Sequence, residues 1–202
     1  MKQLNIKALL KTMVKELLLE GRKTKLNVYD FDSTLAITKE KVMIRNKEGK
    51  IVKTLTAHEY AEYQKLPDEV TDYRDFKSVK DAEINEPVFN SFVHSIKNKN
   101  SKNTTYILTA RGSDSGVWIY KFLQDNNVSL SQSHIITLDS SDPLDKSGWI
   151  KNKMIELGVA TVFFCDDSIR NVKAVETLNQ DEDLNNRFGK RLKIKTEHIK
   201  IY

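Results

Sequence analysis

Two pairs of aspartates are the residues of this sequence best suited to chemistry. Asp30 and Asp32 lie at the end of an apolar run at residues 26–31, and Asp166 and Asp167 end a later one. Residues two apart in extended backbone project to the same side, so the first pair reaches one small volume. Carboxylates held that close repel each other unless protons or a cation compensate, and the second pair favours a divalent cation. Oxygen-only ligands favour Mg²⁺.

Alternating strands and helices must position these acids. The apolar pattern predicts strands at residues 26–31, 104–108, 134–138 and 161–165, and helices from residue 87 and over 117–123, 147–157 and 168–178. This alternation predicts an α/β fold, a doubly wound, Rossmann-like parallel sheet with helices on both faces. Residues 192–201 are expected to add an edge strand. In such a sheet ligands bind at the carboxyl ends of the strands, where the acids lie.

A polar segment separates the first two predicted strands. Residues 38–86 show no long periodic run but carry a hairpin signal around residues 46–50, and we interpret them as an insertion over the site. The expected layout is an amphipathic helix within residues 1–24, a catalytic domain at 25–180 that holds the insertion, and a basic segment at 181–202. The N-terminal helix either packs on the domain or offers a surface to a partner or a membrane interface.

Composition indicates one folded, soluble domain. The chain has 202 residues, of which 39% are hydrophobic and 30% charged. Its single cysteine, Cys165, excludes an intrachain disulfide and a zinc-type cysteine cluster, so we expect a reducing, cytoplasmic location. Lys7, Lys11 and Lys15 interrupt the apolar N-terminal run, which therefore predicts no transmembrane segment.

The net charge of +5 is unevenly distributed along the chain. Residues 1–25 and residues 187–202 each carry +5, which leaves −5 for the middle. Basic ends attract a polyanion such as nucleic acid, although solvated tails without a partner have the same composition. The oligomeric state is left open by the sequence.

Four motifs in order resemble those of the haloacid dehalogenase (HAD) superfamily. They are Asp30-x-Asp32-x-Thr34, the strand end Tyr106–Arg111, Lys146, and residues 163–168 with Asp166-Asp167-Ser168. The resemblance covers roughly residues 26–178. The form of the last motif and the compact build also resemble HAD-like phosphatases of phages and nucleic-acid repair. The resemblance implies a HAD-like sheet with a small cap, which the insertion after the first strand would supply.

The resemblance also implies catalytic roles. Asp30 would attack phosphorus to form an aspartyl phosphate, and Asp32 would protonate the leaving alcohol and then deprotonate the attacking water. Thr109 and Lys146 would hold the phosphoryl oxygens, and the substrate-binding set would be Thr109, Ala110, Arg111 and Lys146. An acid at position 32 is typical of the family's phosphatases and phosphomutases and not of its dehalogenases.

The resemblance further implies a Mg²⁺ site. Its ligands would be Asp30, the backbone carbonyl of Asp32, and Asp167, with Asp166 acting through a water. Asn171 stands where many members of the family have another acid that supports the metal site. An asparagine there weakens that support without abolishing it. Ser33 stands where glycine is frequent.

Three of these residues have alternative interpretations. Thr109 would otherwise be a helix cap. Lys151 and Lys153 compete with Lys146 as the lysine of the third motif, since all three fall on one predicted helix. Arg111 either contacts the phosphate or substrate or is a solvated surface arginine.

The function expected is a magnesium-dependent phosphomonoester hydrolase that acts on a nucleotide or a nucleic-acid end. Alternatives are a phosphatase of a small metabolite or a phosphoprotein, and a HAD-like binding protein without catalysis; a phosphomutase ranks below simple hydrolysis. The sequence has no Gly-x-x-x-x-Gly-Lys loop, which argues against an attached P-loop kinase.

Overall fold

The computed structural model describes residues 24–97 and 102–200. The predicted N-terminal helix lies outside these ranges. Among the helices that they contain, none combines the length and the hydropathy needed to cross a membrane.

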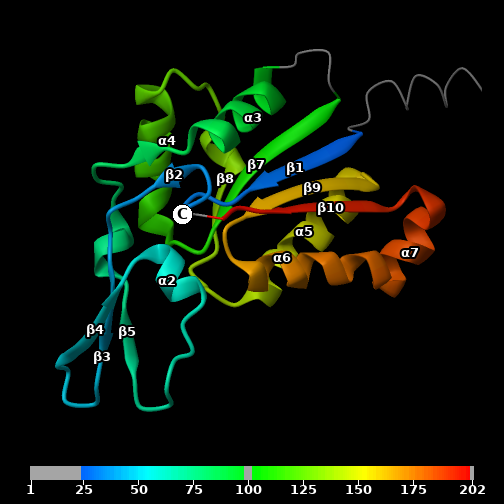
Figure 1. Cartoon of the computed structure of the whole chain (residues 1–202). Helices are drawn as coiled ribbons and strands as arrows, with labels where there is room; N and C mark the ends of the chain where they lie inside the picture. The colour runs from blue at the N-terminus through cyan, green and yellow to red at the C-terminus, as the bar shows by residue number, and fades with distance from the viewer. Residues whose placement is uncertain (1–23, 98–101, 201–202) are drawn as a thin grey trace, which may run out of the picture.

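A five-stranded, all-parallel sheet forms the centre of the molecule and confirms the predicted α/β, Rossmann-like architecture (Figure 1). The strands, in their order across the sheet, are β10 (Lys193–His198), β9 (Thr161–Asp166), β1 (Lys25–Tyr29), β7 (Asn103–Thr109) and β8 (Ile135–Thr137). The predicted C-terminal edge strand is β10, which pairs in parallel with β9. The sheet therefore extends to His198.

Helices cover both faces of the sheet, as predicted. One face is covered by α3 (Glu86–Lys97) and α4 (Gly116–Asp125), and the other by α5 (Pro143–Leu157), α6 (Ile169–Glu176) and α7 (Glu182–Phe188) (Figure 1). Short 3₁₀ helices occupy Arg74–Lys77, Ser113–Ser115, Gln132–His134, Thr177–Gln180 and Gly189–Arg191. The sequence analysis missed α7, because its short amphipathic run follows directly on the predicted last helix.

Side-chain alternation in the central strands builds two separate cores. Tyr106 and Leu108 of β7 pack with α5, α6 and α7, whereas Ile107 between them packs with α3 and α4. Successive residues of a strand point to opposite faces, so an unbroken apolar run is what a strand buried on both faces requires. This run also made β7 easy to predict from the sequence.

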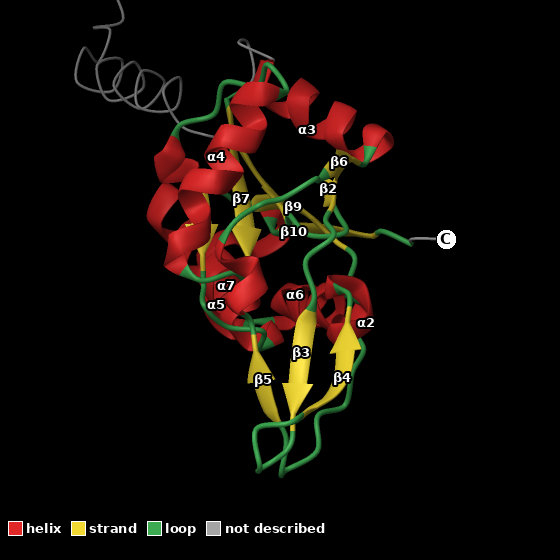
Figure 2. Ribbon diagram, turned by 90° about the vertical axis from the view of Figure 1, so that its left-hand side faces the viewer, coloured by secondary structure: helices red, strands yellow, loops and turns green. Residues whose placement is uncertain are grey.

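The insertion forms a small module beside the sheet (Figure 2). A three-stranded antiparallel sheet in the order β4-β3-β5 carries its own buried cluster of Val42, Ile44, Leu55 and Phe76. The elements are β2 (Ala36–Ile37), β3 (Val42–Arg45), β4 (Ile51–Leu55), α2 (Ala57–Ala61), β5 (Val70–Asp72) and β6 (Glu83–Ile84). Pairing of β2 with β6 closes the base of the module.

The predicted hairpin in this module is confirmed. Its turn lies between β3 and β4, where Asn46 N donates to Lys50 O at 3.0 Å and Gly49 has a φ of 79°. The sequence analysis missed α2, β5 and the two short strands at the base. Four of the five residues of β4 are exposed, so this strand lacks the alternation that predicts a half-buried one.

Truncation of a buried side chain in the core beneath α3 and α4 should strongly destabilise the protein. Leu123→Ala in α4 is expected to lower the free energy of unfolding by about 2–5 kcal/mol, because Leu123 is fully buried. Leu144→Ala in α5 is the matched control, since Leu144 is 68% exposed, and it should change that free energy by less than about 0.5 kcal/mol. Urea unfolding of both variants checks this; equal losses would contradict the assigned core.

Candidate active site

The candidate site lies where the chain reverses its direction across the sheet. From β1 the chain proceeds to β7 and β8, and it then returns to β9 on the other side of β1. Neighbouring strands whose connections leave in opposite directions open a crevice at their carboxyl ends. Asp30 directly follows β1, and Asp166 ends β9. A cavity of about 1550 Å³ opens there between the sheet and the insertion.

A tight turn after β1 brings the first motif back toward β9. The predicted strand at 26–31 is too long, because β1 ends at Tyr29 and the carbonyl of Phe31 accepts hydrogen bonds from both Leu35 N and Ala36 N, at 3.0 Å each. Ser33 has a φ of 60°, the left-handed region that explains why glycine suits this position. Thr34 Oγ1 then accepts a 3.0 Å bond from Asp167 N. The first and fourth motifs are thereby fixed to each other.

Lys146 lies between two carboxylates of the site. Its Nζ donates to Asp30 Oδ1 at 2.6 Å and to Asp166 Oδ2 at 2.8 Å, and all three side chains are buried. Of the three competing lysines on α5, the structure brings only Lys146 to Asp30. Lys151 pairs with acids near α7, and Lys153 pairs with Glu156.

Asp166 is held from several directions. Asn171 Nδ2 lies 3.0 Å from each of its carboxylate oxygens, and Ser168 N donates to its Oδ1 at 2.8 Å. The amide of Asn171 can donate both bonds, which an ionised acid at that position could not. Asn171 therefore supports Asp166, and through it the orientation of Lys146.

Electrostatics show that negative charge is in excess at the site. Burial raises the pKa of Asp30 well above its usual range, Lys146 opposes this rise, and the charges of Asp166, Asp167 and Asp32 add to it. Burial and then the charge of Asp166 raise the pKa of Asp167 to about 8. Burial opposes the charged form of Lys146, but Asp166 and Asp30 outweigh it and raise the pKa of the lysine.

The donor set suits a hard divalent cation. Asp30, Asp166 and Asp167 each offer a carboxylate oxygen, and these oxygens lie within 4.8 Å of one another. Burial is the main reason why the pKa values of Asp30 and Asp167 are raised, and the neighbouring carboxylates, which the one lysine does not balance, add to it. A cation with oxygen preference, such as Mg²⁺, fits this set because it supplies the missing positive charge.

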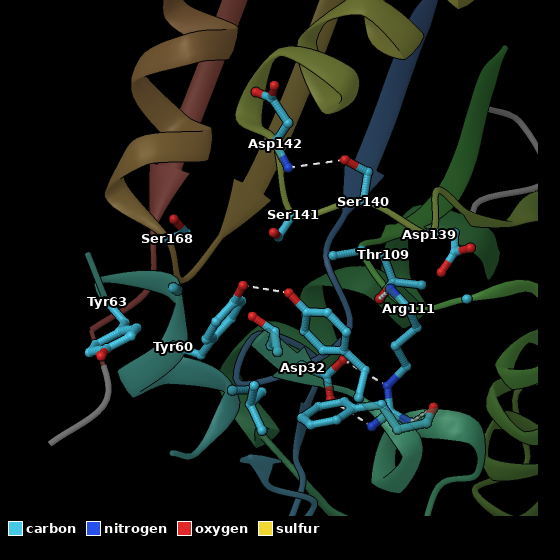
Figure 3. Close-up of a pocket in the computed structure, with 18 of the residues that line it drawn as sticks. Asp32, Tyr60, Tyr63, Thr109, Arg111, Asp139, Ser140, Ser141, Asp142 and Ser168 are labelled. Atoms are coloured by element: carbon cyan, nitrogen blue, oxygen red, sulfur yellow. Dashed lines mark hydrogen bonds and ion pairs between the residues drawn. The ribbon is translucent and has the colours of Figure 1, made fainter. Parts of the chain in front are cut away.

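Asp32 is held by a planar fork from Arg111 (Figure 3). Arg111 Nε and Nη2 donate to its two carboxylate oxygens at 2.8 and 2.7 Å, and Thr38 Oγ1 donates to Oδ1 at 2.7 Å. The interpretation of Arg111 as a solvated arginine is wrong, since its side chain is 2% exposed. Its partners are distant in sequence, so this burial could not be predicted from local patterning.

The hydroxyl of Thr109 borders the same cavity. Thr109 is 1% exposed and its Oγ1 accepts a 3.2 Å bond from Arg111 N. Ala110 also lines the cavity. The 3₁₀ helix after this strand is preceded by Gly112, so Thr109 is not its N-cap. The helix-cap interpretation of Thr109 is therefore wrong.

The insertion contributes a residue that the sequence analysis missed. His58 of α2 places its Nδ1 2.9 Å from Asp167 Oδ2. The helix that carries it begins with a capping box, in which Thr56 and Glu59 bond each other's backbone N–H groups. That Thr-x-x-Glu signal is visible in the sequence and predicts the start of a helix.

Comparison with known proteins returned no match among family models, curated proteins or solved structures. The fold class is shown by the parallel sheet and the helices on its two faces. A functional assignment therefore depends on the side chains that line the cavity.

Removal of the buried lysine should destabilise the protein. Lys146→Met is expected to lower the free energy of unfolding in metal-free buffer by about 3 kcal/mol, because buried carboxylates lose their counter-charge. Lys151→Met is the matched control on the same helix, and a much smaller change is expected because solvent and salt screen its ion pairs. Urea unfolding measures both. Similar small losses would show that Lys146 is not the counter-charge of the site.

The raised pKa of Asp167 predicts how pH affects stability. The folded carboxyl has a pKa of about 8 and the unfolded one about 3.9, so the folded protein binds more protons between these values. Through this group the metal-free protein loses stability as the pH rises through that window. A cation binds the ionised form, so Mg²⁺ should raise the Tm more at about pH 8 than at about pH 6.

Thermal melts with Mg²⁺ and with a chelator at both pH values check this expectation. Asp167→Asn is the control, and it should reduce the pH dependence of the Mg²⁺ effect, because an amide does not titrate, and leave the part that comes from Asp30. An equal rise in Tm at both pH values in the unsubstituted protein would contradict the assignment of Asp167 to the cation site.

Proposed function

We propose that this chain is a magnesium-dependent phosphomonoester hydrolase of the HAD superfamily, with Asp30 as nucleophile and Asp32 as general acid and base. The observation that carries the proposal is the 2.6 Å contact between Lys146 Nζ and Asp30 Oδ1 at the reversal point of the sheet. Asp30, Asp166 and Asp167 each place a carboxylate oxygen there within 4.8 Å of the others. A lysine at this distance opposes the rise that burial causes in the pKa of Asp30, and so favours the ionised form that a nucleophile needs. The order of the four motifs supports the same assignment.

The first step would transfer the phosphoryl group to the protein. A carboxylate oxygen of Asp30 attacks phosphorus, the bond from phosphorus to the leaving oxygen breaks, and Asp32 gives that oxygen its proton. Lys146 and the hydroxyl of Thr109 would hold the phosphoryl oxygens. Mg²⁺, held by Asp30, the backbone carbonyl of Asp32 and Asp167, would supply positive charge opposite the phosphate.

The second step would release the phosphate. Asp32 takes a proton from water as the water oxygen attacks phosphorus, and the bond between phosphorus and Asp30 breaks. Inorganic phosphate leaves and both aspartates return to their starting states. One carboxylate serves both steps because the group that donates a proton in the first is the base needed in the second.

The insertion would act as the cap that selects the substrate. The cavity of about 1550 Å³ exceeds the roughly 300–1,000 Å³ of a usual small-molecule pocket, so it accommodates more than a small phosphoester. Tyr60, Tyr63 and Tyr73 line its insertion side together with Lys65 and Arg74. Aromatic rings stack on nucleobases and cations bind phosphates, so this wall favours a nucleotide or a nucleic-acid end over a small metabolite.

Phosphate release tests the proposal. Wild-type protein is expected to release phosphate from nitrophenyl phosphate and, more efficiently, from a nucleotide or a 3′- or 5′-phosphorylated oligonucleotide, only when Mg²⁺ is present. Asp30→Asn should abolish release, and Asp32→Asn should slow it by at least about 100-fold on unactivated substrates, because general acid catalysis is lost.

Asp145→Asn is the matched control, since Asp145 lies on α5 without a role in the site, and it should keep full activity. No release from any substrate would favour the alternative of a binding protein that lacks catalysis. Release that survives Asp30→Asn would overturn the assignment of the nucleophile.

A further inference from the structure

Two short segments connect the insertion to the core, and they are tied to each other. Residues 38–41 lead from β2 into β3, and residues 76–82 lead back toward β6. Lys80 N, in the second segment, donates to Glu40 Oε1, in the first, at 2.7 Å. Lys41 N donates to Asp75 Oδ2 at 2.9 Å. The two connections therefore move as one unit at the base of the insertion.

Arg111 of the core reaches both connections and the acid/base aspartate. Its Nη1 donates to Phe76 O at 3.1 Å and to Ser78 O at 2.6 Å, and its Nε and Nη2 form the fork to Asp32. Nη2 also lies 3.6 Å from Glu40 Oε2. The donors of the guanidinium are thus directed at protein groups, which leaves it poorly placed to bind a phosphate as well.

Aromatic rings from both halves of the molecule lie close to this guanidinium. It lies 5.6 Å from the ring centroid of Phe31, next to Asp32 in the core, and 4.8 Å from that of Phe76 in the insertion. A guanidinium is planar and rigid, so its edges cannot move independently. A shift of the insertion must therefore move the fork that holds Asp32.

Glu40 is the least satisfied group of this cluster. Its side chain is 1% exposed, and its Oε2 has no hydrogen-bond partner among the described residues. A buried carboxylate oxygen without a donor is costly, and Arg111 is the cation that faces it. The charge of Glu40 therefore draws the guanidinium toward the first connecting segment.

We infer that Arg111 and Glu40 are positioning residues that couple the placement of the insertion to the placement of the Asp32 carboxylate. This inference rests on the proposed role of Asp32 in catalysis. The insertion then acts on proton delivery to the leaving group as well as on substrate choice. Arg111 acts through Asp32 and not by contact with the phosphate.

Leaving-group dependence distinguishes this role from phosphate binding. Nitrophenyl phosphate loses its leaving group without much help from an acid, whereas a simple alkyl phosphate depends on protonation. Arg111→Lys should lower kcat/KM, which reports the first step and not the release of phosphate from Asp30, by about 100-fold for the alkyl phosphate and by less than about tenfold for nitrophenyl phosphate. The inhibition constant of inorganic phosphate should change by less than about threefold. Glu40→Gln should act in the same direction, by about tenfold on the alkyl phosphate.

Glu83→Gln is the matched control, because Glu83 lies at the same base of the insertion but its side chain is 75% exposed, and both rates should stay unchanged. Equal losses of kcat/KM on both substrates, or a large rise in the inhibition constant of inorganic phosphate, would overturn the inference. The first result would indicate a purely structural role and the second a phosphate contact.

A distance measurement tests the coupling without any activity. Spin labels would be attached through Val52→Cys in β4 and Val117→Cys in α4, which are both exposed, while the native Cys165 is buried and does not react. The parent protein should give one narrow distance distribution, and Arg111→Lys and Glu40→Gln should broaden or shift it, unlike Glu83→Gln. Unchanged distributions in the first two variants would overturn the coupling. If the wild type hydrolyses neither phosphate, the proposed function fails, and this measurement alone decides the coupling.

Discussion

Burial of like charge at one edge of the sheet is the constraint on which the rest of the site depends. Asp30, Asp166 and Asp167 are each at most 5% exposed, and Lys146 is the buried lysine that faces them. The polypeptide reduces the resulting repulsion with donors at fixed positions, such as the amide of Asn171. Burial, together with the residual excess of negative charge, raises the pKa values of Asp30 and Asp167, and the three carboxylates could hold a cation.

The core and the insertion each supply part of the same cavity. The sheet provides the acids, because the carboxyl ends of β1 and β9 adjoin at the point where the chain reverses direction. The insertion provides aromatic and cationic side chains and places His58 against Asp167. A separate buried cluster lets the insertion keep its own shape. Contacts at its base and the contact of His58 with Asp167 join the insertion to the core beside the acids.

The sequence predicted the parts of the molecule that local patterning specifies. The strands β1, β7 and β9 are short apolar runs, and polar residues at their ends identify the edge at which a site forms. The elements of the insertion were harder to predict, since β4 is mostly exposed and α2 spans five residues, too few for a periodic signal. The ordered motifs predicted that Lys146 and Asp30 meet, but other contacts between distant segments were not predicted. Arg111 is 79 residues from Asp32, and only the folded chain shows that the pair is buried.

The two buried cations of the site differ in a way that follows from their chemistry. Lys146 is a compact charge on a flexible stem, and it contacts one oxygen on each of two carboxylates that it must hold apart. Arg111 is a planar fork that binds both oxygens of a single carboxylate and fixes its orientation. A nucleophile needs its charge offset while it keeps a free oxygen, whereas an acid/base group needs a defined direction for its proton. The lysine at Asp30 and the arginine at Asp32 match these two requirements under the roles proposed for the two aspartates.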